Sequence, residues 1–174
     1  MKNENILMRG DPKKFIKMEL STLLAKMYYP TVLSNLFLNY GLEKATEYLN
    51  SIGDRAAKYF LQYYQPKADT PFKMVKEMSK FVGKSYEIKR NPKDRTYVVR
   101  TKKCPLCHDM PELNLPGLKN CQPISGFING FFKYVVPLKN PKLINYKAYQ
   151  GTITKSVASG DKYCELVIKN MEEL

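Results

Sequence analysis

The fold class follows from residues 72–102, FKMVKEMSKFVGKSYEIKRNPKDRTYVVRTK. Before Gly83 the apolar residues recur at every third or fourth position, as on one face of a helix. After Gly83 they alternate with charged residues, as in a half-buried strand. The alternating positions are Tyr86, Ile88, Tyr97 and Val99. Turn-forming residues at 91–94 separate the two alternating runs, so the stretch predicts a helix closed by Gly83 and then a β-hairpin.

Three more helices are expected upstream. They cover residues 11–29, 31–41 and 42–64. Asp11 and Pro12 suit the start of the first helix, since Asp caps the free N–H groups and Pro lacks one. We expect that helix to end before Pro30, because proline interrupts the hydrogen-bond ladder of a helix. Gly41 suits the end of the second helix, and Pro66 stops the third.

Small residues interrupt two of the apolar stripes. Gly53 lies inside the stripe of residues 42–64, where a glycine costs about 1 kcal/mol relative to alanine. We expect it to mark close packing against another helix, with a break into two helices as the alternative. Gly126 and Gly130 lie in a short helix that also carries Phe127 and Phe131. Something is expected to pack closely on this helix as well.

The last third returns to strands. A cysteine-bearing loop at 104–119 precedes the short helix, and strands are expected within 145–157 and 163–169, joined by a tight turn at 159–161. No repeat or linker divides the chain, so one domain is expected over residues 1–174. The order predicts an α+β fold, with N-terminal helices packed on a four-stranded antiparallel sheet and a helix between the two hairpins.

Composition narrows the class of protein. The chain has 174 residues, 44% of them hydrophobic, which excludes a disordered tail and a disulfide-stapled miniprotein. We expect a soluble, cytoplasmic protein, because neither an export signal nor a membrane span stands out. The net charge of +13 favours anionic partners, but a Lys-rich surface also suits a heat-adapted organism, and that simpler interpretation comes first. Nucleic-acid binding by a basic zinc module is kept as the weaker alternative.

The four cysteines are the strongest chemical feature. Cys104 and Cys107 form a Cys-x-x-Cys turn, and Cys121 follows at a spacing common in zinc loops. A fourth ligand would come from Cys164, at the start of a core strand, or from His108. Zinc takes four such ligands in a tetrahedron, so a four-thiolate zinc site is predicted.

Other roles for the cysteines stay open. Cys121 and Cys164 could be small buried hydrophobes, with Cys104 and Cys107 an oxidised pair or exposed thiols. A redox function is less favoured, since a thioredoxin-like Cys-x-x-Cys opens a helix and here proline and acidic residues follow. Neither a dinucleotide-binding nor a phosphate-binding glycine motif is present, so no cofactor motif supports an enzyme.

Several motifs resemble those of a known family. The segments 104–107, CPLC, 121–130, CQPISGFING, and above all 160–168, GDKYCELVI, resemble the C-terminal signature of the 4-vinyl-reductase-type (hydrocarbon-binding) domain. The segment 49–53, LNSIG, is similar to a helix that this domain shares with the TRAPP vesicle-tethering subunits. The zinc-binding relatives typically carry a Glu and a Cys before the last turn, where this chain has Ile153 and Ser156. That departure puts the family's metal site in question.

The resemblance implies a small-molecule-binding fold. Its members include sensors of hydrophobic or aromatic compounds and free-standing archaeal proteins, and they are commonly dimeric. We therefore expect a small hydrophobic ligand between helices and sheet, in a homodimer. The expected wall residues are Tyr97, Val99, Phe127 and Phe131, chosen because they lie on inward faces. A non-catalytic assembly scaffold, pairing through its helices as the tethering subunits do, is the alternative.

Overall fold

The structure is a computed structural model. It describes residues 12–64, 66, 68, 70–82, 85–91, 93, 95–108, 110–135 and 146–172, with the side chains of 12–25 and 82 left out. Asp11 and Gly83, which the sequence places at helix ends, lie outside the described residues. The elements are the helices α1 (Pro12–Tyr63), α2 (Pro71–Val82) and α3 (Gln122–Tyr134), the strands β1 (Tyr86–Asn91), β2 (Thr96–Thr101), β3 (Tyr149–Lys155) and β4 (Cys164–Asn170), and the short 3-10 turns η2 (Tyr146–Ala148) and η3 (Val157–Ser159).

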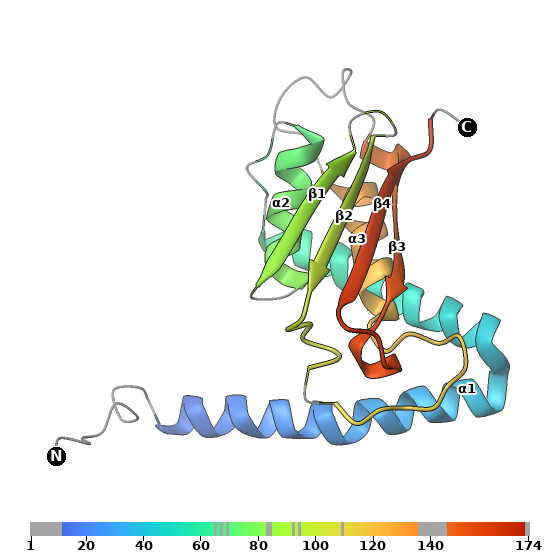
Figure 1. Ribbon diagram of the computed structural model, residues 1–174. Coiled ribbons are helices and arrows are strands. Elements are labelled where there is room, and N and C mark those ends of the chain that lie inside the picture. Colours follow the sequence, from blue (N-terminus) through green and yellow to red (C-terminus); the bar gives the residue numbers. More distant parts are fainter. Residues whose placement is uncertain are drawn as a thin grey trace, which may run out of the picture.

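The predicted α+β architecture is confirmed. The strands form one antiparallel sheet in the order β1-β2-β4-β3, and α3 lies between the two hairpins in sequence. Figure 1 shows α2 and α3 on one side of this sheet, with the later part of α1 passing behind α3. The two shorter helices and the later part of α1 therefore cover a single face of the sheet.

The expected helix end before Pro30 is wrong. Pro30 lies inside α1 and is buried, and the helix runs on to Gly41, where φ is 74° and the axis kinks. Packing explains why the helix survives a residue that normally breaks it. Leu33, one turn later, is fully buried against a loop that supplies Leu113, Leu115 and Leu118. Figure 1 shows this loop running beside the first half of α1, which extends away from the sheet.

Gly53 and the two glycines of α3 bring the helices together, as the sequence predicts. A Cβ added to Gly126 would lie 2.0 Å from the carbonyl oxygen of Asn50 on α1, and one added to Gly130 would lie 2.9 Å from the Cα of Asp54. Such distances leave no room for any side chain, so the α1 and α3 backbones are in direct contact. The Asn50 side chain also accepts a hydrogen bond of 2.9 Å from Gln122.

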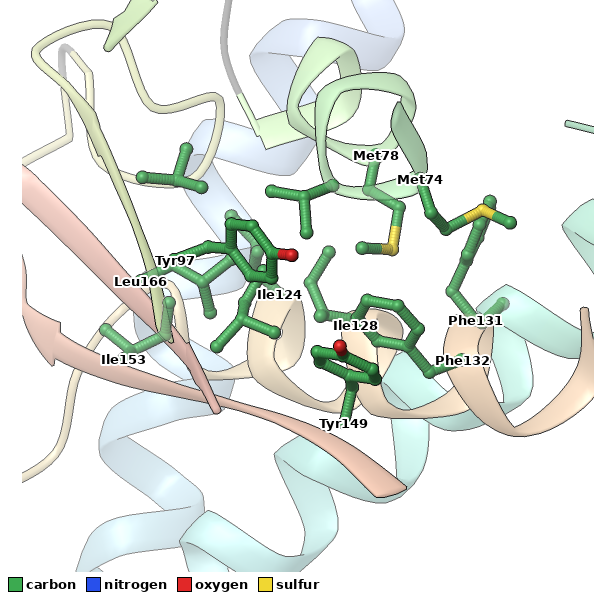
Figure 2. Close-up of a cluster of buried hydrophobic side chains, with 14 of the residues drawn as sticks. Met74, Met78, Tyr97, Ile124, Ile128, Phe131, Phe132, Tyr149, Ile153 and Leu166 are labelled. Atoms are coloured by element: carbon green, nitrogen blue, oxygen red, sulfur yellow. The ribbon is translucent and has the colours of Figure 1, made fainter. Parts of the chain in front are cut away.

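The core lies between α2, α3 and the covered face of the sheet. Figure 2 shows side chains from the two helices and from β2, β3 and β4 converging on this region. Its labelled members are Met74, Met78, Tyr97, Ile124, Ile128, Phe131, Phe132, Tyr149, Ile153 and Leu166, all of them buried. Ser125 also donates a hydrogen bond of 2.6 Å to the carbonyl of Gly151, which fixes α3 on β3. Within the described residues, no helix is long and apolar enough to cross a membrane.

Candidate metal centre and apolar groove

The four cysteines meet in space. Their Sγ atoms all lie within 4.8 Å of one another, and all four side chains are buried. Cys104 and Cys107 come from the loop after β2, Cys121 directly precedes α3, and Cys164 is the first residue of β4. The structure thus joins residues that lie up to 60 positions apart in the sequence, from Cys104 to Cys164. None of the four forms a disulfide.

Local backbone geometry sets the direction of each sulfur. The N–H groups of Cys107 and His108 donate to the Cys104 carbonyl at 3.1 and 2.8 Å, so the Cys-x-x-Cys segment forms a tight turn. Antiparallel pairing places Cys164 opposite Thr101, at the end of the strand that leads to this turn. Cys121 stands at the N-terminus of α3, whose position the glycine contacts fix.

Ser156 is the fifth polar group at the cluster. Its hydroxyl lies 3.4 Å from the Cys107 Sγ, and the N–H of Val157 donates to the Cys164 Sγ at 3.3 Å. The Asp161 carboxylate accepts a hydrogen bond of 2.8 Å from the Ser156 N–H and so holds this turn in place. Ile153 lies in the hydrophobic core that also includes the four cysteines. Of the two positions where this chain departs from the zinc-binding pattern, Ser156 thus places a polar atom beside a cluster sulfur, and Ile153 contributes an apolar side chain.

Hydrogen bonds among the four sulfur atoms shift their pKa values in opposite directions. A hydrogen bond from Cys104 lowers the pKa of Cys107, and the same contact raises the pKa of Cys104. Cys104 also lowers the pKa of Cys164 and raises that of Cys121. These hydrogen bonds therefore favour the thiolate form of Cys107 and Cys164 over that of Cys104 and Cys121. A divalent cation would replace those protons, and all four sulfurs could then bind it as thiolates.

The cluster fits a tetrahedral metal site. Four thiolates at about 2.3 Å from a zinc ion stand about 3.8 Å apart, which matches sulfur atoms gathered within 4.8 Å. The nearby donors add support, since hydrogen bonds from Ser156 and Val157 would stabilise thiolate charge. His108 is exposed and is not one of the grouped side chains. The four buried cysteines could hold a metal ion without it.

An apolar groove lies beside the cluster. It has a volume of about 290 Å³, and its walls come from α1, α2, α3 and the Cys-x-x-Cys turn. The lining residues are Ile52, Gly53, Ala56, Phe60, Phe81, Pro105, Leu106, Pro123, Ile124 and Phe127. None of these ten residues has a polar side chain. Ile52 and Phe81 are 49% and 39% exposed, so the groove opens to solvent with apolar walls.

The four residues expected to form the wall of the ligand site lie in two parts of the structure, the groove and the core. Phe127 lines the groove, and Phe131 lies behind it, with its ring 6.0 Å from that of Phe127. Tyr97 and Val99 are buried in the core on β2. The groove thus lies among the helices, whereas Tyr97 and Val99 pack in the buried core between the helices and the sheet, where the ligand was expected.

One wall of the groove comes from α1. Ile52, Ala56 and Phe60 belong to the apolar stripe of residues 42–64, which the sequence predicts to pack inside the protein, yet they line an open surface. The apolar stripe of residues 42–64 is wider than α3 alone can cover, and that width was the available signal.

Comparison with solved structures supports the fold. The chain resembles the crystal structure of trafficking protein particle complex subunit 3 from Naegleria fowleri covalently bound to palmitic acid, with a TM-score of 0.63 and 18% sequence identity, covering 87% of this chain and 95% of that chain. No protein-family model and no curated protein matches. At this identity the likeness shows a TRAPP-subunit-like fold. The resemblance to the 4-vinyl-reductase-type domain stays a prediction.

Proposed function

We propose that this protein binds a small hydrophobic or aromatic molecule in the apolar groove and holds a structural zinc ion at the four cysteines. The observation that carries the proposal is the groove itself, whose ten lining residues are all apolar although it is open to water. Exposed apolar surface that is concave favours a ligand, because the ligand buries both its own surface and that of the walls.

Size and chemistry limit the ligand. An apolar cavity of about 150 Å³ holds one benzene ring, so a groove of about 290 Å³ that opens to solvent has room for two ring systems, such as a phenyl and a naphthyl group, or for a short acyl segment. A charged group would find no partner among the lining residues and would have to project into solvent. None of these residues is a nucleophile, so binding is non-covalent. The covalent palmitic acid of the structural neighbour supports an apolar ligand but not the same attachment.

The zinc ion would act structurally. Cys104, Cys107, Cys121 and Cys164 would supply all four ligands, and a closed set of this kind leaves no open position for substrate. Its effect is to connect the loop after β2, the start of α3 and the start of β4. This proposal rests on the buried position and mutual proximity of the four sulfur atoms.

The ligand site can be tested with N-phenyl-1-naphthylamine, a neutral probe that fluoresces in apolar surroundings. We expect the probe to bind and to be displaced by short-chain fatty acids or two-ring aromatics. The variant Ala56→Trp, which fills the groove, should weaken probe binding at least 10-fold. Lys58→Trp adds the same side chain to the exposed surface of α1 outside the groove and should bind like wild type. Equal binding by both variants would place the probe elsewhere and reject the proposal.

A second candidate is an assembly scaffold. Large hydrophobic side chains are exposed on α1, among them Leu38 at 78% and Tyr63 at 90%, which is typical of surfaces that a partner covers. We propose a homodimer formed through α1 as this alternative. Native mass spectrometry would show a dimer that the variant Leu38→Lys weakens. A monomer at micromolar concentration would reject it and leave the ligand site unaffected.

A further inference from the structure

The groove and the cysteine cluster share the same short segments of chain. Pro105 and Leu106 are the two residues between Cys104 and Cys107, and both line the groove. Pro123 and Ile124 follow Cys121 by two and three positions, and they line it as well. Four of the ten lining residues are thus within three positions of a cluster cysteine.

The Cys-x-x-Cys turn contacts the rest of the protein through its sulfur atoms and through Leu106, which packs against the hydrophobic core. The backbone N–H groups of Cys107, His108 and Met110 all donate within the turn itself, to the carbonyls of Cys104 or Cys107. The Cys107 Sγ, in contrast, contacts Ser156, and the Sγ atoms of the turn meet those of Cys121 and Cys164. Because these backbone hydrogen bonds stay within the turn, loss of the sulfur contacts would loosen the wall that Pro105 and Leu106 form and leave it held by the packing of Leu106.

The opposite wall does not depend on the cluster. Ile52 and Ala56 belong to the long helix α1, and Gly53 between them is fixed against α3 by direct backbone contact. Phe60 and Phe81 pack on each other with ring centroids 4.7 Å apart. One side of the groove is thus rigid by helix packing, and the other side is held by the cysteines.

We propose that metal binding at the four cysteines and hydrophobic-ligand binding in the groove are positively coupled. The proposal rests on the proposed function. A metal ion fixes Pro105 and Leu106 where a ligand needs them, so the ligand does not have to order that wall. By linkage, a bound ligand must strengthen metal binding by the same factor. Because the ligand also holds the turn closed, we expect it to slow metal loss. Couplings between sites in proteins are commonly about 5- to 150-fold, and we expect about 10-fold here.

The first experiment compares probe affinity in two forms of the full chain, zinc-loaded and stripped by a chelator in reducing buffer. N-phenyl-1-naphthylamine should bind the zinc-loaded form about 10-fold more tightly. Equal affinity would overturn the coupling while leaving the ligand site intact. Absence of binding in both forms would overturn the proposed function and the coupling with it.

The second experiment starts from zinc-loaded protein only, so unfolding of the stripped form does not affect it. Zinc transfer to a chromogenic chelator is followed with and without saturating probe. The probe should slow the transfer several-fold in wild type and in Lys58→Trp. In Ala56→Trp, where the indole fills the groove, the probe should have no effect. If the probe leaves the rate of zinc transfer from wild type unchanged, or changes this rate equally in both variants, the coupling is contradicted.

Discussion

Gly53 of α1 and Pro123 of α3 are so close that a Cβ on Gly53 would lie 2.0 Å from the Pro123 carbonyl oxygen. This contact sets the distance between two of the helices that line the groove. In an exposed helix, Gly→Ala stabilises by about 1 kcal/mol, because alanine favours the helix.

Here Gly53→Ala should destabilise instead, by about 1–3 kcal/mol or more, since the backbones must move apart. Gly126→Ala should behave in the same way, because its Cβ would lie 2.0 Å from the Asn50 carbonyl oxygen. Urea unfolding of both variants gives the sign directly. A stabilised Gly53→Ala protein would show that the two helices are farther apart than described.

The cysteine cluster predicts about one zinc ion per chain in protein purified under reducing conditions. Cys164→Ser should lose most of the metal and unfold at a lower temperature, because the three remaining thiolates leave one position of the tetrahedron open. His108→Ala is the control, since this exposed side chain is outside the cluster, and it should keep its zinc. Elemental analysis and calorimetry make the comparison. Zinc-free wild type, or loss of zinc in His108→Ala, would refute this assignment.

Acid should release the metal. Protons compete with zinc for thiolate sulfur, so zinc is retained at neutral pH and lost as the pH falls. Ser156 should shift this balance, because its hydroxyl lies 3.4 Å from the Cys107 Sγ and can donate to the thiolate. The variant Ser156→Ala should therefore release zinc at higher pH than wild type. A release curve that is unchanged by the substitution would show that this hydrogen bond does not stabilise the bound thiolate.

Glu165 predicts a second pH dependence, on the open face of the sheet. Burial opposes ionisation of this residue, but hydrogen bonds from Thr154 at 2.8 Å and Arg100 at 2.7 Å hold its pKa below the usual value. The ionised Glu165 carboxylate and its two partners therefore stabilise the folded protein above the unfolded pKa of about 4.3. That stability is lost as the pH falls through the lower pKa that Glu165 has in the folded protein.

The variant Glu165→Gln should therefore lose less stability than wild type on acidification below about pH 4.3. Glu87→Gln is the control, because Glu87 forms an exposed ion pair with Lys89 at 3.5 Å that contributes little. Thermal unfolding temperatures of wild type, Glu165→Gln and Glu87→Gln, measured across this pH range, test the difference. Parallel curves for wild type and Glu165→Gln would contradict the depressed pKa.

Much of the fold could be predicted because its signals are local. Alternation at Tyr86 and Tyr97 predicted the hairpin, and Gly126 and Gly130 predicted a close contact, which α1 makes. The cysteine cluster was also predictable, because a turn, a helix start and a strand start each fix one part of it. The continuation of the helix through Pro30 could not be predicted, because the loop that buries Leu33 lies some eighty positions away in sequence.

The position of the groove could not be predicted from local sequence patterns either, because it depends on how segments far apart in sequence pack together. Periodicity assigns Phe127 and Phe131 to one inward face of α3, but the crossing of α1 decides which of them lines an opening. Phe127 does so, and Phe131 lies in the core behind it. A stripe of apolar residues has the same appearance in sequence whether a helix or a ligand covers it.

Methyl-labelled NMR would locate the ligand. With N-phenyl-1-naphthylamine bound, the methyl groups of Ile52, Leu106 and Ile124 should show Overhauser contacts to the probe, because all three line the groove. Methyl groups of Leu33 and Ile168, buried elsewhere, should show none. Contacts confined to Ile153 and Leu166 would instead place the ligand against the sheet and contradict the account.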